Sequence, residues 1–326
     1  MSDCAVVWIR DDFRIRNNHA LSFACKNHDA VTVIYIHNKE YFDGKREAQR
    51  WWISKSLESF SNDLEKFNIK LETIISDETS FYSKLKTKDK ISIYWNKVYE
   101  PDHLKLDKEI EKILEKKNIP FKFFKGNILN EYQSITKNDG TPFKVFSPFW
   151  RNAEQVFLDA VPQKTSEIKK LKSKKTLFNS KDTFKQIMPK KDWFKKFDQY
   201  WKPSEDEAHK NLKEFISNRI SKYGVDRDYP SINGSSKLSP YIRNGQIHVA
   251  AIYEKSSKDI KKNPRPILIE CETFRLRGHE EASGVKHVPE NLIKFWKERD
   301  PIKNFEYYFL IQLPFLVSNL PYCVIY

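Results

Sequence analysis

Residues 4–9 read CAVVWI and residues 31–36 read VTVIYI, two short and almost continuously apolar runs. The runs KLETII at 70–75, ISIYWN at 91–96 and IPFKFF at 119–124 have a similar character. Apolar runs of this length, largely without polar alternation, are typical of strands that are covered on both faces of a sheet. We therefore expect these five runs to be the strands of one buried sheet.

Amphipathic helical patterns separate these runs. The clearest pattern covers residues 46–68, where Trp52 and Leu57 belong to one apolar stripe, and another covers residues 104–118. Strands that alternate with helices form parallel sheets with helices on both faces. The sequence therefore predicts a doubly wound parallel α/β domain over residues 1–128.

The pattern changes after about residue 125. Residues 129–200 are rich in loop signals and lysine runs, which predicts an interdomain linker. Helical periodicity returns at 205–224, directly after Ser204, an N-cap that is followed by acidic residues. We expect the start of a helical domain at 201–262, which is incomplete. Residues 263–326 are expected to form an unrelated tail.

Composition narrows the class of protein. The net charge is +14, which favours a nucleic-acid partner, although 45 lysines against 13 arginines are equally consistent with a biased genome. The four cysteines are far apart and have no zinc-ligand spacing, so neither a disulfide framework nor a metal site is expected. The N-terminus lacks a signal-peptide layout, and the apolar stretch at 307–326 contains two prolines. We expect a monomeric cytoplasmic protein with no membrane partner.

Four segments in order carry a family resemblance. They are WIRDDFRIRNNHAL at 8–21, YWNKVYEP at 94–101, GTPFKVFSPFWR at 140–151 and the run from Trp201 to Tyr241. Together they resemble the DNA photolyase and cryptochrome family of blue-light flavoproteins. Asn17 and His19 depart from the family's Asp and Pro. The resemblance implies deoxyribodipyrimidine photolyase activity, in which FAD and light repair cyclobutane pyrimidine dimers in damaged DNA, or a cryptochrome-like signalling function.

The turn at Asn233–Gly234 leads into clustered hydroxyls, which can hold a phosphate or simply cap a helix. The resemblance implies that this region binds FAD and that Arg227 lies near DNA. The residues alone favour an ion pair between Arg227 and Asp228, or a helix cap at Arg227. The resemblance also implies an antenna pigment such as a folate. Asp102 and His103 match the family's folate-contact position poorly. Trp51 and Trp52 are expected in the helix core and not at a chromophore. The implied FAD contacts are Tyr223, Ser235, Ser236, Lys237, Leu238 and Ser239.

The family pattern ends at about residue 262. Residues 263–302 instead resemble the alpha subunit of thiamine-diphosphate-dependent 2-oxo acid dehydrogenases, through Arg275, Arg277, His279 and Trp296 among others. No counterpart of that family's metal and diphosphate motif is present. The sequence therefore predicts only half of a flavin site and a chain that does not repair dimers by itself. A fused or truncated reading frame without function is the remaining alternative.

Overall fold

The computed structural model describes most of the chain up to residue 262. The predicted dehydrogenase-like segment at 263–302 and the apolar stretch at 307–326 lie outside the described residues. The described residues divide by their contacts into two units. Unit 1 takes those within 1–127, 163–219 and 235–252, and unit 2 takes those within 128–162, 220–234 and 253–262. The described residues are 3–39, 47–86, 90–129, 131, 135–159, 165–178, 180, 184–189, 192–229 and 231–262.

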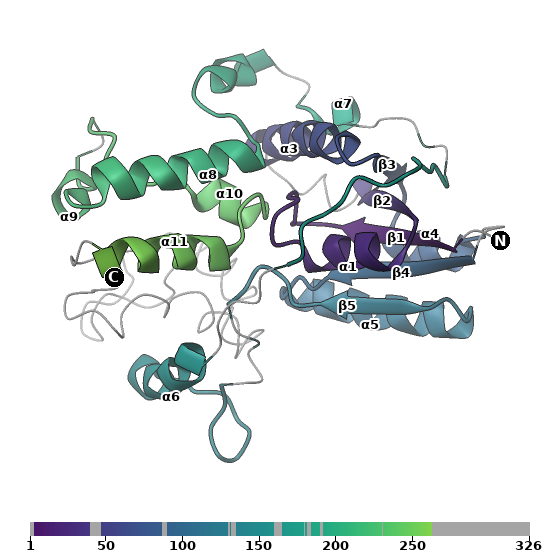
Figure 1. Cartoon of the computed structure of the whole chain (residues 1–326), viewed down its shortest axis with the longest axis horizontal. Coiled ribbons are helices and arrows are strands. Elements are labelled where there is room, and N and C mark those ends of the chain that lie inside the picture. Colours follow the sequence, from purple (N-terminus) through teal and green to yellow (C-terminus); the bar gives the residue numbers. More distant parts are fainter. Residues whose placement is uncertain are drawn as a thin grey trace, which may run out of the picture. The chain divides into compact units, whose positions relative to one another are not determined.

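Unit 1 contains a five-stranded parallel sheet with the strand order β3-β2-β1-β4-β5 (Figure 1). The strands are β1 (Asp3–Ile9), β2 (Ala30–His37), β3 (Lys70–Ile75), β4 (Lys90–Asn96) and β5 (Phe121–Phe124). All five predicted strands are present, each within a few residues of its predicted bounds. The predicted α/β fold class with a parallel sheet is confirmed.

Helices cover both faces of this sheet. One buried cluster joins α1 (His19–Asn27) and α3 (Glu47–Glu65) to the side of the sheet that carries Ala5, Val7 and Ile9. The opposite side, which carries Val6 and Trp8, forms a second buried cluster with α4 (Glu78–Lys84) and α5 (Pro101–Lys116). Because successive side chains of a strand point to opposite faces, an apolar run supplies both clusters at once.

An extended segment crosses from one face of the sheet to the other near the start of β3. We call residues 165–178 the strap; it is drawn in teal in Figure 1. Leu171 packs in the α1–α3 cluster, whereas Leu177 and Phe178 pack against the α4–α5 cluster. The strap therefore contributes apolar side chains to both layers, although its own sequence has no periodic pattern.

The strap is attached to the sheet domain mainly through its backbone. Carbonyl oxygens of Ser166, Leu171 and Lys175 accept hydrogen bonds from side chains of the sheet domain, at 3.0, 2.7 and 3.0 Å. The carboxylate of Glu72 in β3 accepts hydrogen bonds from the backbone N–H groups of Leu177 at 2.8 Å, and also from those of Phe178 and Ser180. Glu72 is fully buried. These bonds require no particular side chain on the strap, which explains why its sequence gives no signal.

The chain after the strap is mainly helical. The predicted helix at 205–224 is interrupted, because the α-helix α8 stops at Glu214 and a single π-helical turn follows. Ser217 and Asn218 in that turn compete for backbone hydrogen bonds, which makes an uninterrupted helix less favourable. The remaining elements are α6 (Phe146–Asp159), α7 (Phe184–Ile187), η2 (Asp192–Gln199), α8 (Glu205–Glu214), η3 (Phe215–Arg219), α9 (Tyr223–Asp226), α10 (Ser239–Arg243) and α11 (Val249–Lys262).

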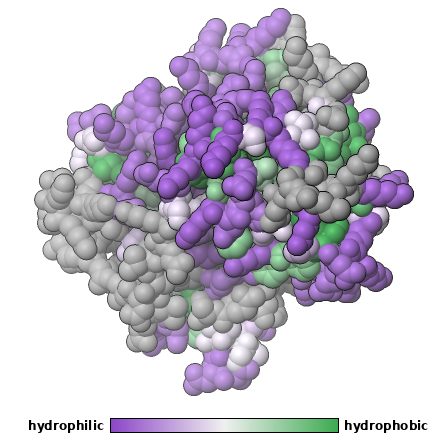
Figure 2. Space-filling model, turned by 45° about the vertical axis from the view of Figure 1, so that its right-hand side comes forward, coloured by the Kyte–Doolittle hydropathy of each residue, from purple (hydrophilic) through white to green (hydrophobic). Residues whose placement is uncertain are grey.

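One face of the molecule shows how polar and apolar residues are distributed on the surface. The face in Figure 2 is largely hydrophilic, and its apolar residues form only small patches. None of the helices that the structure describes combines the length and the apolar character needed to span a bilayer.

Candidate functional site

The loop at 235–239, which precedes α10, contains five of the six residues expected to hold FAD. Ser235, Lys237 and Ser239 are exposed, Ser236 is half-buried, and Leu238 is buried and anchors the loop. The hydroxyl oxygen of Ser236 accepts a hydrogen bond from the backbone N–H of Leu238 at 3.4 Å. The loop therefore presents hydroxyl groups and one ammonium group on the surface of unit 1.

The backbone of this loop has the geometry of an anion-binding turn. Lys237 has a left-handed φ of 55°, and Leu238 follows in the right-handed region with φ of −87° and ψ of −19°. Two consecutive residues of opposite hand turn their own N–H groups and that of the next residue toward one point, which forms a concave site for an anion. Here these are the N–H groups of Lys237, Leu238 and Ser239, of which that of Leu238 already donates to Ser236. Within the described part of the chain, no acceptor takes the backbone N–H groups of Ser235, Ser236 or Lys237. This donor set suits a phosphate group.

Arg219 holds this loop and was missed by the sequence analysis. It ends the π-helix η3, and its Nη1 donates a hydrogen bond to the carbonyl oxygen of Ser235 at 3.1 Å. Its side chain is only 16% exposed, and its Nη2 lies 4.0 Å from Oε2 of Glu214. Single π-helical turns are common at functional sites. No local pattern in the sequence marks this turn, so Arg219 could not be singled out.

The other two predicted site residues belong to unit 2. Tyr223 is buried, and the guanidinium of Arg227 lies 5.8 Å from the centre of its ring. Nε of Arg227 is 3.6 Å from a carboxylate oxygen of Asp228, so the ion pair that the residues alone favoured is present. Gly234 packs closely against this helix, since a Cβ atom at Gly234 would lie 2.6 Å from Cβ of Asp226.

A buried polar network occupies the carboxyl ends of β1 and β4, where the first two family segments meet. Asp12 accepts hydrogen bonds from the backbone N–H of Arg10 at 2.8 Å and from Nδ2 of Asn96 at 2.7 Å. Arg10 pairs with Asp107 at 2.7 Å. Burial raises the pKa of Asp12, partly offset by the nearby charge of Arg14. These motif residues connect the two strand ends to each other.

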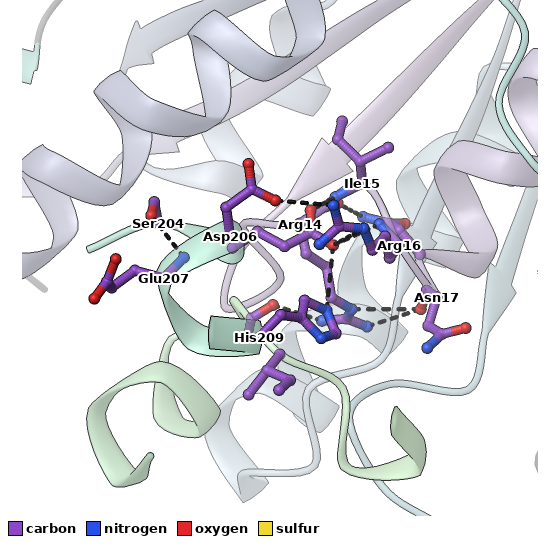
Figure 3. Close-up of polar contacts among 12 residues, drawn as sticks. Arg14, Ile15, Arg16, Asn17, Ser204, Asp206, Glu207 and His209 are labelled. Carbon is purple, nitrogen blue, oxygen red and sulfur yellow. Dashed lines mark hydrogen bonds and ion pairs between the residues drawn. The ribbon is translucent and has the colours of Figure 1, made fainter. Parts of the chain in front are cut away.

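Glu205, the first residue of α8, binds the loop that follows β1. Its carboxylate accepts hydrogen bonds from the backbone N–H groups of Ile15 at 2.6 Å and Arg16 at 3.0 Å. Arg16 also reaches Asp206 at 2.8 Å, and Figure 3 shows Arg14 to Asn17 facing the first turns of α8. Burial raises the pKa of Glu205, although the two backbone N–H groups act in the opposite direction.

The two departures from the family pattern, Asn17 and His19, lie close together in the sequence at the start of α1. Asn17 has a left-handed φ of 54°, a conformation that asparagine tolerates better than most residues. His19 opens α1 and its ring lies 6.2 Å from that of His248. Burial lowers the pKa of His19 to about 4, and the charges of Arg14 and Lys125 lower it further.

His248 is buried and held in one tautomer. Its Nδ1 accepts a hydrogen bond from the backbone N–H of Ala250 at 3.0 Å, so its Nε2 carries the proton and donates to the carbonyl of Gly126 at 3.2 Å. Burial lowers the pKa of His248 well below its usual value. The imidazole is therefore neutral near pH 7.

The remaining predictions concern chromophores and metals. Trp51 and Trp52 are 1% and 7% exposed, which confirms that they belong to the helix core. His103 lies 3.8 Å from Glu100, and burial lowers the pKa of His103 to about 4. The residues that the structure describes contain no cluster of three or more metal-ligating side chains.

Comparisons with known proteins agree with the family resemblance of the four sequence segments. Residues 5–169 match the family model described as DNA photolyase. The deoxyribodipyrimidine photo-lyase of Agrobacterium fabrum is 28% identical over 314 residues, which cover 92% of this chain and 64% of the relative. Cryptochrome-2 of Arabidopsis thaliana is 24% identical over 264 residues, which cover 78% of this chain and 43% of the relative. An alignment over 92% of the chain necessarily extends beyond residue 262.

A solved structure gives the same result. A bacterial class III photolyase from Agrobacterium tumefaciens superposes with a TM-score of 0.71 at 28% identity, over 81% of this chain and 54% of that protein. The chain thus spans less than two thirds of the length of each of these proteins. Since the family model covers half of the chain and includes all but the first two residues of the parallel sheet, the chain belongs to the DNA photolyase family.

Proposed function

We propose that this chain takes part in the FAD-dependent, light-driven repair of cyclobutane pyrimidine dimers in DNA. The chemistry in such a reaction is supplied by the flavin, which donates an electron when it is excited by light. The contribution of the protein is to bind and orient the cofactor and the pyrimidine dimer. The observation that carries the proposal is the anion-binding loop at 235–239, in a chain of the photolyase family.

The proposed roles follow from the donors of this loop. The backbone N–H groups of Ser235, Ser236 and Lys237 would bind phosphate oxygens of FAD, and the ammonium of Lys237 would offset their negative charge. The hydroxyls of Ser235 and Ser239 are exposed and able to donate further hydrogen bonds. Arg219 would keep the loop in place through the Ser235 carbonyl. Tyr223 remains a proposed FAD contact, and Arg227 a proposed phosphate contact on DNA.

The chain as given would thus hold the phosphate end of FAD. None of the residues above is proposed to contact the flavin ring, in keeping with the half site that the sequence predicts. A photolyase-type antenna pigment remains a proposal without a residue of this chain assigned to it. The dehydrogenase-like origin of residues 263–302 also remains a proposal.

Calorimetric titration with FAD and with ADP tests the loop. Asparagine tolerates a left-handed φ, so Lys237→Asn removes the charge and keeps the backbone conformation. We expect about tenfold weaker binding of both ligands, since a charge-assisted hydrogen bond contributes about 1.5 kcal/mol. The control Lys222→Asn removes an equally exposed lysine outside the loop and should leave both affinities unchanged. Equal losses in the two variants, or no binding by the unaltered chain, would refute the loop as the cofactor site.

A second experiment separates repair from signalling. Dimer-containing oligonucleotide is illuminated with the chain and with FAD that dithionite keeps reduced in the absence of oxygen, and the remaining dimers are counted by chromatography. Light-dependent loss of dimers supports the photolyase proposal and contradicts the sequence-based prediction that this chain alone is inactive. FAD binding without repair agrees both with a photolyase half-site that is inactive alone and with the cryptochrome-like alternative, which the similarity to cryptochrome-2 makes the second candidate.

A further inference from the structure

We propose that the strap carries a second nucleic-acid contact, which binds the phosphate backbone of duplex DNA through Lys169, Lys170 and Lys172. Residues 169–175 read KKLKSKK, so five of these seven residues are lysines. Lys169, Lys170, Lys172 and Lys174 are all exposed. The contact is separate from the flavin loop and needs neither FAD nor a lesion.

The lysines extend from a backbone that is fixed. Leu171 lies in the middle of the run, is 8% exposed and packs in the α1–α3 cluster. Its N–H donates to the carbonyl of Phe67 at 3.0 Å, and its carbonyl accepts from Nδ2 of Asn68 at 2.7 Å. Because the backbone is already ordered, binding a partner costs only the side-chain entropy of the lysines.

The protein leaves most of this charge unneutralised. Glu65 pairs with Lys174, and no acidic side chain among the described residues pairs with Lys169, Lys170 or Lys172. Charges of one sign held this close together repel each other and destabilise the fold. An external polyanion would relieve that repulsion.

The chemistry favours a phosphate backbone over a lipid surface. A lysine ammonium is a point charge that contacts phosphate without a geometric requirement, as sequence-independent binding needs. Attachment to a membrane usually combines basic residues with exposed apolar or aromatic ones. Of the large apolar residues that are exposed in the described part of the chain, none lies between residues 165 and 178.

The test is the salt dependence of binding to an undamaged duplex in the dark, followed by fluorescence anisotropy. The triple variant Lys169→Gln, Lys170→Gln, Lys172→Gln should lower the slope of log K against log salt by about 2 to 3, since each phosphate contact contributes about 0.9. At 0.1 M salt, about a tenfold or greater loss of affinity should accompany it. The matched control, Lys108→Gln, Lys112→Gln, Lys116→Gln on α5, removes the same charge from three equally exposed positions.

The outcomes are distinct. A loss of duplex affinity and of salt dependence that is confined to the strap triple variant supports the proposal. The unfolding midpoint of this variant in urea should equal or exceed that of the unaltered chain. An equal loss in the two triples would show that only net charge matters and would overturn it, as would no duplex binding at all. Strap-dependent binding to phosphatidylserine vesicles with an unchanged DNA slope would reassign the surface to lipid. FAD is absent throughout, so the result is independent of the flavin loop.

Discussion

Two buried glutamates in unit 1 perform the same task in different surroundings. Glu72 lies within β3 and binds backbone N–H groups of the strap, more than 100 residues later in the chain. Glu205 lies at the start of α8 and binds backbone N–H groups of the loop after β1, 190 residues earlier. Glu72 is 0% exposed, whereas Glu205 is 5% exposed and also lies 3.8 Å from His209 and from Arg16.

The difference teaches how a carboxylate can be buried. Among the described residues, Glu72 accepts hydrogen bonds from backbone N–H groups alone, so its removal leaves these donors without an acceptor. Glu205 shares its loop with cationic side chains and with the N-terminus of a helix, which can compensate for part of its loss. We therefore expect the strap to depend on one side chain and the β1 loop to depend on several.

The largest effect is expected for Glu72→Ala. It leaves three partly buried N–H groups without an acceptor, and the expected loss is about 4 kcal/mol in the free energy of unfolding. Glu205→Ala should cost about half as much by the same reasoning. Urea unfolding measures both, with Glu58→Ala on the exposed side of α3 as a control. Equal losses of stability at the two glutamates would show that the strap does not depend on one side chain more than the β1 loop does.

Gly245 tests how closely the chain packs against the β1 loop. It has a left-handed φ of 63°, and a Cβ atom there would lie 1.9 Å from the carbonyl oxygen of Asp11. Gly245→Ala is expected to cost about 3 kcal/mol through backbone displacement and conformational strain. Gly140→Ala is a matched control, because Gly140 has a φ of 77° and nothing within 4 Å of the added atom. The control should lose only about 1 kcal/mol.

Two histidines beside the β1 loop should make the stability of the protein depend on pH. The pKa values of His19 and His248 are lowered in the folded protein, His19 to about 4, whereas an unfolded histidine titrates near pH 6.5. Between these values the unfolded chain binds more protons, so stability falls as the pH decreases from about 6.5 toward 4. Each histidine contributes at most about 1.4 kcal/mol per pH unit.

His248→Asn keeps an acceptor for the Ala250 N–H and removes the titrating group. Its stability relative to the unaltered chain should therefore rise by up to about 1.4 kcal/mol per pH unit below pH 6. Thermal unfolding at several pH values provides the measurement. Parallel curves for the two proteins would exclude His248 as a source of acid sensitivity.

The smallest effect is expected for Glu205→Gln. Because the pKa of Glu205 is raised, the folded protein retains this proton to higher pH than the unfolded chain, and stability falls as the pH rises above about 4.5. Glutamine resembles the protonated form, so the variant should lose about 1 kcal/mol or less at pH 7 and should flatten that slope. A steeper dependence on pH than in the unaltered chain would contradict the assignment.

The sequence predicted the sheet well because buried parallel strands leave a direct record in their apolar residues, as in CAVVWI at 4–9. It identified the loop at 235–239 only through family resemblance, since clustered serines alone also fit an ordinary helix cap. It could not predict Glu72 or Glu205, because their partners are backbone N–H groups that any residue except proline can supply. Arg219 could not be predicted either, because its partner is a backbone carbonyl group, which every residue has.

The strap also has a consequence for the order of events during synthesis. Leu171, Leu177 and Phe178 complete both apolar layers beside β3, yet they are translated about 100 residues after it. At about 5 to 20 residues per second, the nascent sheet domain waits about 5 to 20 s for these side chains. During that interval, apolar surface on both sides of the sheet stays exposed to other chains. The yield of folded protein should therefore depend on how quickly the ribosome reaches residue 180.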